Sequence, residues 1–303
     1  MAFWRIIRLL ATPLLAFGTL LHLTIADAWA PAAVLFYALP LPVLAGCWLA
    51  LAVLWGWKRK VSLLCLALAL GSGTWWFAVS YREAPLRPRQ SPVLKVFYWN
   101  MAHRPLPSTE LELLLQEHQP DIAGFVEVGR RHGDPNPLTA KLPAGCTAFK
   151  LDHGMAVVVR GTLNSVRQEM LPSSSKFAAV DVTVDGVTWH LFIVDGVSRP
   201  TTSREDVLQR VLSESTGMSR VVIVGDFNTP VESAHFASWE RTLHHAFNET
   251  GSGFRETWPR WVPVLTIDHV WSSADVPPLK AQRLWSQGSD HAALAVDLGA
   301  RSH

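Results

Sequence analysis

The stretch VVIVGDFNTP, residues 221–230, decides the fold of this chain. Its first four residues are apolar and β-branched, a composition typical of a strand that is buried on both faces. Gly225, Asp226 and Asn228 follow at once, and these residue types favour turns over strand interiors. The stretch therefore predicts a core strand that carries a carboxylate and an amide to one edge of a sheet.

Four other predicted strands border the same kinds of polar side chain. The residues at these borders are Asn100, Glu127, Asp268, Asp290 and His291. Each of them taken alone is a turn former or a cap. Together they predict one rim where hard oxygen ligands converge, and such ligands suit Mg²⁺ held jointly with a substrate phosphate. An Asp and His pair beside the metal suits proton transfer and the stabilisation of transition-state charge.

Motifs of several other enzyme classes are missing from the sequence. It contains no GxxxxGK[ST] phosphate loop and no GxSxG nucleophile elbow. Its His and Cys residues nowhere have the spacing of a zinc site. The rim of acids and amides is therefore the feature that carries the predicted chemistry.

The chain after residue 92 reads as short apolar strands separated by polar turns. Strands are predicted at 93–99, 122–128, 155–160, 178–184, 189–194, 221–224, 265–271 and 292–298. Helices are predicted at 109–118, with Ser108 as N-cap, at 204–214 and at 232–243. Asp185-Gly186 is a hairpin turn signal between two of the strands. Many strands with few long helices indicate an α+β sandwich of two sheets.

Three motifs near the C-terminus resemble the endonuclease/exonuclease/phosphatase (DNase I-like) superfamily. They are Gly225-Asp226-Phe227-Asn228, Ile267-Asp268-His269-Val270 and Ser289-Asp290-His291, in this order. Weaker matches are Trp99-Asn100, Pro120-Asp121-Ile122 leading to Glu127, and the run from Gly154 to Arg160. The resemblance covers most of residues 93–303. It implies a four-layered α/β sandwich, in which two packed mixed β-sheets are flanked by helices, and cleavage of a phosphodiester or phosphomonoester.

The resemblance also implies a divalent metal, usually Mg²⁺, with Mn²⁺ as the alternative. Glu127 would be the principal metal ligand, with Asn100 beside it. Asp290 would support the metal or the attacking water.

Four further residues take catalytic roles by the same resemblance. Asp226 would orient or activate the attacking water, and Asn228 would hold the phosphate. His291 would stabilise or protonate at phosphorus, held in place by Asp268.

One position departs from the family pattern. The strand 190–198 reads HLFIVDGVS, and Gly196 stands where many members place a His. Glycine has no side-chain donor, and losing one transition-state donor can cost on the order of 10²–10³ in rate. Residues that could compensate as substrate-binding groups are His103, His153, Asp195 and Arg199. The alternative is that they are ordinary surface residues, although His103 follows Asn100 closely enough to share the rim.

The N-terminal region contains three stretches without a charged residue, 9–26, 28–57 and 61–81, apart from Asp27 between the first two. About 20 apolar residues cross a bilayer core of roughly 30 Å. We therefore predict a membrane region with three transmembrane helices at 1–81, a linker at 82–92 and the catalytic domain at 93–303. The alternatives are helices buried in a soluble domain, or a first stretch that is a cleaved signal ending near Ala26-Asp27-Ala28 or Ala28-Trp29-Ala30.

Basic residues near the span ends set the expected orientation. Arg5 and Arg8 precede the first stretch, and Lys58, Arg59 and Lys60 separate the second from the third. Both regions should be cytoplasmic, which makes the chain a multi-pass protein of the inner or cell membrane with an extracytoplasmic C-terminal domain. The arginines of the linker weaken the rule. Three cysteines, two of them inside predicted spans, give no disulfide framework.

The charge of the catalytic domain bears on its substrate. Residues 93–303 hold 19 Lys and Arg against 23 Asp and Glu, a formal net charge of −4. Nucleic-acid binding depends on Lys and Arg that neutralise phosphates, so a nuclease is disfavoured.

The membrane anchor points to another substrate class. An anchored enzyme meets lipid headgroups at high effective concentration. We therefore favour a membrane-tethered phosphoesterase that hydrolyses a phosphodiester or pyrophosphate of a lipid or polyprenyl phosphate, as in membrane-anchored bacterial relatives. A tethered nuclease and a catalytically weak binding protein are the alternatives. Trp258 and Trp261 are the tryptophans expected at the surface, and the oligomeric state stays open.

Overall fold

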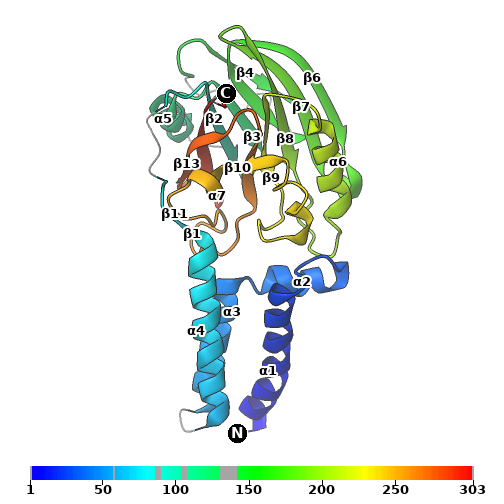
Figure 1. Ribbon diagram of the computed structural model, residues 1–303, viewed down its shortest axis with the longest axis vertical. Helices are drawn as coiled ribbons and strands as arrows, with labels where there is room; N and C mark the ends of the chain where they lie inside the picture. Colours follow the sequence, from blue (N-terminus) through cyan, green and yellow to red (C-terminus); the bar gives the residue numbers. More distant parts are fainter. Residues whose placement is uncertain (1, 57–58, 86–89, 104–107, 130–141, 302–303) are drawn as a thin grey trace. The chain divides into compact units, whose positions relative to one another are not determined.

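The structure is a computed structural model that describes residues 2–56, 59–85, 90–103, 108–129 and 142–301 (Figure 1). The chain forms two compact units. The first comprises Met1–Tyr81 together with two short segments from later in the sequence, Arg199–Ser203 and Glu232–His235. The second comprises Arg82–Ser198, Arg204–Val231 and Phe236–His303.

The N-terminal part of the first unit is helical. Its helices are α1 (Ala2–Leu23), α2 (Ala30–Ala38), α3 (Leu41–Trp55) and α4 (Lys60–Ser80). Two spans, Phe3–Leu23 and Lys60–Ser80, are long and apolar enough to cross a membrane, judged by length and composition. Helices α2 and α3 add a third only if this pair, bent by 69°, counts as one span. The prediction of three transmembrane helices is therefore supported only in part, because the described residues contain two or three candidate membrane spans.

The bend between α2 and α3 follows from Pro40. A proline cannot donate to the preceding helical turn, and it disfavours the helical conformation of the residue before it. Leu39 accordingly has φ −122° and ψ 57°, and α3 restarts with Pro40 as its N-cap. The uncharged stretch 28–57 is thus divided in two, which its hydropathy alone could not show.

Asp27 has three hydrogen-bond donors inside the first unit, where it is only 1% exposed. Its carboxylate accepts hydrogen bonds from the Tyr37 hydroxyl and the Ser233 hydroxyl, each at 2.6 Å, and from the Ala234 amide at 2.9 Å. A buried carboxylate is costly unless it is hydrogen-bonded in this way. These bonds explain why Glu232–His235 belongs to the same unit as the N-terminal helices.

The second unit contains two six-stranded sheets. The first has the order β13-β14-β2-β3-β5-β4, with β2 Leu94–Asn100, β3 Ile122–Val126, β4 Cys146–Lys150, β5 Ala156–Arg160, β13 Pro278–Leu284 and β14 Ala293–Leu298. The second has the order β10-β12-β9-β8-β7-β6, with β6 Thr162–Met170, β7 Lys176–Val184, β8 Val187–Asp195, β9 Val221–Asp226, β10 Leu243–His245 and β12 Asp268–Ser273. Each sheet is mixed, because β2 pairs with β3 and β8 with β9 in parallel while the other pairs are antiparallel.

Helices cover the outer faces of both sheets, as Figure 1 shows for α5 and α6. The remaining elements are α5 Ser108–His118, α6 Glu205–Ser215, α7 Ala246–Thr250, three 3₁₀ turns at Asp152–Gly154, Pro172–Ser174 and Ala234–Phe236, and the short strands β1 Tyr81–Arg82 and β11 Gly253–Phe254. Leu111 and Leu115 of α5 pack on the first sheet, and Val207 and Val211 of α6 pack on the second. The predicted α+β fold of two mixed sheets flanked by helices is confirmed.

The apolar character of β9 now has a structural reason. Val222 and Val224 lie in the core between the two sheets, whereas Val221 and Ile223 lie in the core under α6. Both faces of the strand are therefore buried, so every position must be apolar until the chain leaves the sheet.

Some predicted elements were wrong. Residues 232–243 do not form a helix but a series of turns around the 3₁₀ segment Ala234–Phe236. The reason is packing, because the side chains of Phe236 and Trp239 turn into the core under α6 and Leu243 begins β10. The strand predicted at 265–271 begins only at Asp268, and β4, β6, β10 and β13 were not predicted.

Candidate active site

The strand pairings bring the predicted polar residues to one end of the second unit. Asn100 ends β2 and pairs with Val126 on the parallel strand β3, so Glu127 follows at the same sheet edge. Asp226 ends β9, opposite Asp195 of the parallel strand β8 and Asp268 of the antiparallel strand β12. Parallel strands place their carboxyl ends together, and an antiparallel neighbour contributes its amino end to the same edge.

Asp226 is the centre of this end and is 1% exposed. Its Oδ2 accepts a hydrogen bond from Asn100 Nδ2 at 2.8 Å, and its Oδ1 accepts one from the Asn228 amide, also at 2.8 Å. The Ala102 amide in turn donates to Asn100 Oδ1 at 2.8 Å. The Asp226 carboxylate is thus fixed in orientation by neighbours on both sides.

Asp268 and His291 form a buried hydrogen-bonded pair. The His291 Nδ1 and Asp268 Oδ2 atoms are 2.9 Å apart, and the same Nδ1 is 3.9 Å from Asp226 Oδ2. The Tyr98 hydroxyl donates to Asp268 Oδ1 at 3.2 Å. Because Nδ1 faces a carboxylate, Nε2 is the imidazole nitrogen that remains for contact with a reacting group.

Burial and charge shift the pKa values of these groups. Burial alone would favour the neutral imidazole, but the charges of Asp268 and Asp226 outweigh it and raise the pKa of His291 to about 10. Burial, followed by the charge of Asp268, raises the pKa of the Asp226 carboxyl well above its usual range. His291 is therefore a cation at neutral pH. The raised pKa of Asp226 means that its ionised form needs more positive charge at this end than His291 supplies, and a bound cation would provide it.

Position 196 has to be glycine, because the neighbouring backbone lies too close for any side chain. A histidine could not be placed here without moving the backbone. A Cβ atom added at Gly196 would lie 2.4 Å from the carbonyl oxygen of Phe227. Its own carbonyl accepts a hydrogen bond from Asn228 Nδ2 at 2.9 Å, and its amide donates to the Asp226 carbonyl at 2.7 Å. The segment 196–197 therefore packs directly on the Asp226–Asn228 turn, which leaves no space for any side chain.

Glu127 and His103 lie together at the edge of the first sheet. Glu127 Oε2 is 3.4 Å from His103 Nε2, and the His103 amide donates to the Glu127 carbonyl at 3.0 Å. The exposed His153 precedes Gly154, whose carbonyl accepts a hydrogen bond from the Val128 amide. Two of the predicted substrate-binding residues, His103 and His153, therefore come from turns next to Glu127.

The other predicted residues have different surroundings. Asp290 Oδ2 accepts a hydrogen bond from Trp258 Nε1 at 3.1 Å, which turns this carboxylate toward the indole. Asp195 is paired with the Lys176 ammonium group. Arg199 belongs to the first unit and not to the unit that holds the other site residues.

Lys176 and Tyr98 are residues of this end that the sequence analysis missed. Lys176 could have been found, because a hairpin centred on Asp185-Gly186 pairs residue 176 with 195, as observed in β7 and β8. Tyr98 carries no such signal, since it lies in an apolar run and reaches Asp268 across 170 residues.

The side chains at this end fit a divalent cation. Asp226, Asp268 and His291 each offer a ligand atom, and these atoms lie within 4.8 Å of one another. Because His291 Nδ1 is already bonded to Asp268, we interpret the three as an Asp–His pair beside Asp226 and not as a closed metal cage. Asp226, Glu127 and Asn100 are hard oxygen donors of the kind that Mg²⁺ and Mn²⁺ prefer.

Two mixed sheets with acidic side chains and an Asp–His pair at one end define the DNase I-like class of hydrolase folds. The Endonuclease/Exonuclease/phosphatase family model matches residues 97–291. The chain belongs to this family, whose members are generally phosphoester hydrolases. No curated protein is similar enough to the chain to count as a match.

Solved structures share the fold. The human Nocturnin catalytic domain, with bound sulfate, is 20% identical, with 71% of this chain and 97% of that one covered and a TM-score of 0.54. D. rerio TDP2 in complex with a single-stranded DNA product is 16% identical, with coverages of 68% and 99% and a TM-score of 0.54. A Bacteroides vulgatus endonuclease/exonuclease/phosphatase is 15% identical, with coverages of 69% and 99% and a TM-score of 0.55. At these identities the likeness concerns the fold alone.

Proposed function

We propose that the protein is a membrane-tethered, divalent-metal-dependent phosphoesterase that hydrolyses a phosphodiester or pyrophosphate of a lipid or polyprenyl phosphate at the outer membrane face. The observation that carries the hydrolase part is the buried network of Asn100, Asp226, Asp268 and His291. Its cationic imidazole beside a carboxylate matches what in-line displacement at phosphorus requires.

The roles of the residues follow from their hydrogen bonds. Asp226, fixed by Asn100 and by the Asn228 amide, is oriented to accept a proton from an attacking water. His291 is protonated at neutral pH, and Asp268 holds its Nδ1, so Nε2 can donate to a phosphoryl or leaving-group oxygen. Glu127 and Asn100 would hold the cation, with Asp290 beside them. A bound cation would polarise the phosphoryl oxygens and offset their charge.

Apolar surface supports the choice of a lipid substrate. The loop that contains Trp261 and Val262 leaves these side chains 79% and 65% exposed. The same loop is tied to the site, because the Arg260 amide donates to the Asp290 carbonyl at 2.8 Å. Tryptophan favours the membrane interface, so this loop is suited to contact lipid near the site. Of the two tryptophans expected at the surface, Trp261 is exposed and Trp258 is partly buried against Asp290.

Apolar helix surfaces support the membrane tether. Leu10 of α1 and Leu63 and Leu70 of α4 are more than 60% exposed, although both helices are strongly apolar. Large apolar side chains on the surface of such helices are expected where the surroundings are lipid.

The test is hydrolysis by the full chain in lipid nanodiscs with Mg²⁺, Mn²⁺ or chelator, on a polyprenyl pyrophosphate, a phosphodiester lipid and single- and double-stranded DNA. We expect metal-dependent release of phosphate from a lipid substrate and its loss in Asp226→Ala and His291→Ala. The control Asp206→Ala removes an exposed carboxylate on α6 and should retain activity. Activity equal to that of the wild type in both Asp226→Ala and His291→Ala would refute the assignment of the active site. Cleavage of DNA but of no lipid substrate would favour the nuclease alternative.

A further inference from the structure

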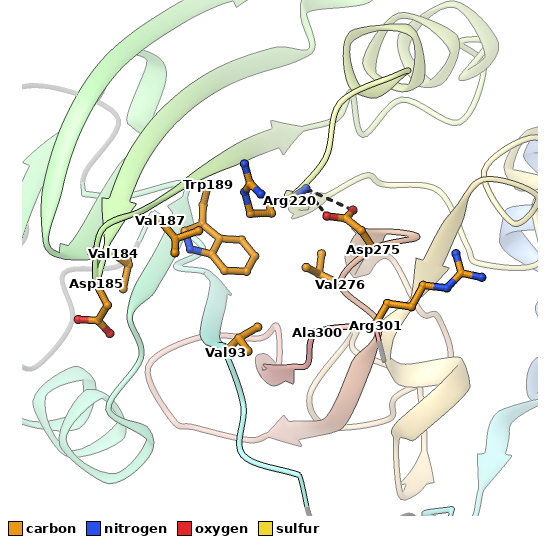
Figure 2. Close-up of a pocket in the computed structure, with 10 residues that line it drawn as sticks. All are labelled: Val93, Val184, Asp185, Val187, Trp189, Arg220, Asp275, Val276, Ala300 and Arg301. Atoms are coloured by element: carbon orange, nitrogen blue, oxygen red, sulfur yellow. Dashed lines mark hydrogen bonds between the residues drawn. The ribbon is translucent and has the colours of Figure 1, made fainter. Parts of the chain in front are cut away.

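A cavity with a volume of about 820 Å³ opens in the second unit (Figure 2). Ligand sites in proteins are concave and typically measure about 300–1,000 Å³. Both sheets contribute to its lining, which combines residues next to β2 and β14 of the first sheet with residues in or next to β7, β8, β9 and β12 of the second.

The cavity and the candidate active site lie at opposite ends of the same strands. Arg220 precedes β9, which ends at Asp226, and Val93 precedes β2, which ends at Asn100. Trp189 lies near the start of β8, which ends at Asp195. With six or seven residues per strand at about 3.3 Å each, the two sites are roughly 20 Å apart. No role in the proposed hydrolysis accounts for this cavity.

The inner wall of the cavity is apolar. Val184, Trp189 and Val276 line it and also belong to the core between the sheets. Val93 and Val187 extend this wall to the surface, where their side chains are 45% and 41% exposed. An apolar ligand placed here would therefore continue the hydrophobic core.

The acidic residues of the lining already have partners. Asp275 accepts hydrogen bonds from the Arg220 amide at 3.0 Å and from the Ser273 hydroxyl at 2.6 Å. Asp185 is bound by both terminal nitrogens of Arg160, at 2.9 and 3.3 Å. Neither carboxylate is available to attract a cation.

The two arginines of the lining keep free donors. Arg220 uses only its Nε, which donates to the Thr188 carbonyl at 2.9 Å. The guanidinium of Arg301 makes no hydrogen bond or ion pair within the described part of the chain. In Figure 2 the Arg220 side chain lies beside the Trp189 indole, whereas the Arg301 side chain extends away from both. Arg220 is therefore the cationic group beside the apolar wall of the cavity.

We propose that this cavity binds an amphipathic anion, whose carboxylate or phosphate head contacts the Arg220 guanidinium and whose apolar chain packs on Trp189, Val187 and Val276. Guanidinium groups bind both kinds of head through charge-assisted hydrogen bonds.

The test uses the full chain in nanodiscs of zwitterionic lipid and a terminally trifluorinated octanoate as the probe, observed by ¹⁹F NMR. We expect saturable binding. Arg220→Gln should weaken it about tenfold or more, since its charge-assisted hydrogen bonds with the head group are lost. Val187→Trp, at an exposed hairpin position, should block the cavity without disturbing the core, and Ala300→Phe provides a second block.

Matched controls lie outside the cavity. Arg241→Gln removes an exposed arginine, and Val166→Trp adds an indole to the exposed face of β6. Both should bind the probe as the wild type does, and so should Asp226→Ala, which separates this site from the proposed catalysis.

Two outcomes would overturn the proposal. One is unchanged binding in Val187→Trp and Ala300→Phe, and the other is equal binding of the corresponding trifluorinated octanol, which has no charge. Competition between octyl phosphate and the octanoate probe identifies the preferred head group. Stronger binding of either the phosphate or the carboxylate supports an anion site.

Discussion

The backbone of His291 is fixed as firmly as its imidazole. Its amide donates to the Ser289 hydroxyl at 3.0 Å, and its carbonyl accepts a hydrogen bond from Trp99 Nε1 at 3.1 Å. With Nδ1 bound to Asp268, the ring has one orientation. A pre-organised donor of this kind needs no reorganisation when charge develops on a substrate.

Replacing Asp268 by Asn should therefore change both the charge and the tautomer of His291. The wild-type imidazole holds its proton up to about pH 10, so its stabilising contact is complete at neutral pH and is lost as pH rises through that value. In Asp268→Asn burial still disfavours the cation while the main opposing charge is gone, so the titration midpoint should fall. We expect turnover of the proposed substrate to fall by on the order of 10²–10⁴.

NMR titration of His291 in metal-free protein measures this midpoint, and steady-state kinetics measures the rate. Tyr98→Phe, which removes one donor to the same carboxylate, should shift both quantities far less. An unchanged midpoint in Asp268→Asn would mean that Asp268 does not hold the proton on His291.

The sequence and the structure give different reasons for the glycine at position 196. In the sequence, Gly196 stands out because it lacks a side-chain donor. In the structure, a Cβ atom at this position would lie 2.4 Å from the Phe227 carbonyl oxygen, and the Gly196 carbonyl accepts a hydrogen bond from the Asn228 side chain. A close backbone approach between segments 31 residues apart leaves no pattern in hydropathy, and only the glycine itself marks it.

At the scale of elements, a chain of two histidines joins α7 and β12 to the turn after Asn228. The Asn248 amide donates to His245 Nδ1, His245 Nε2 lies 3.0 Å from His269 Nδ1, and His269 Nε2 lies 2.9 Å from the Thr229 carbonyl. These partners assign both rings as neutral, each with its proton on Nε2. Burial is the main cause that lowers the pKa of His245 well below its usual value.

The stability of α7 and β12 should consequently fall in mild acid. The folded state excludes a proton from His245 that the unfolded chain binds below about pH 6.5, so the free energy of opening falls as pH drops below that value, by up to about 1.4 kcal/mol per pH unit. Hydrogen exchange of the α7 and β12 amides between pH 5 and 7.5 measures it. His245→Gln should flatten the dependence and the half-exposed neighbour His244→Gln should not. The same slope in both variants would contradict this assignment.

The sequence predicted the elements whose faces are buried and missed those shaped by neighbours. β9 is apolar up to Gly225 and β2 is apolar except for Lys95, and their ends could be predicted from Asp226 and Asn100. β6 is mostly exposed along TLNSVRQEM and has no apolar pattern to detect. Residues 232–243 carry helix-like periodicity, but Phe236 and Trp239 pack into the core under α6 from turns.

At the scale of the whole molecule, hydropathy marks the N-terminal region, but its boundary does not follow the chain. Glu232–His235 belongs to the first unit through hydrogen bonds to Asp27, across more than 200 residues. Asp27 is the one acidic residue among the first 81, and no local pattern pairs it with a serine so far away. A contact between residues this far apart in the chain cannot be predicted from local patterns in the sequence.

The Asp27–Ser233 bond also bears on the number of spans. Residues that are hydrogen-bonded lie on one side of a bilayer, so the chain between 27 and 233 must cross it an even number of times. Among the described residues of that interval, helix α4 is one candidate crossing and the bent pair α2–α3 is the other. If α4 spans the membrane, the bent pair must span it as well, and together with α1, if that helix also crosses, this gives three spans.

Cysteine accessibility tests this count in chains whose native Cys47, Cys65 and Cys146 are replaced. We expect single cysteines at Ala28 and at the exposed Ser173 to react with a membrane-impermeant maleimide in intact cells, and one at Arg59 to react only after permeabilisation, because basic loops stay cytoplasmic. Opposite labelling of positions 28 and 173 would refute the three-span arrangement. Asp27→Ala should increase hydrogen exchange at 232–235, since the Ala234 amide loses its acceptor. Tyr37→Phe leaves that acceptor in place and should have a smaller effect, which ties the topology to the carboxylate itself.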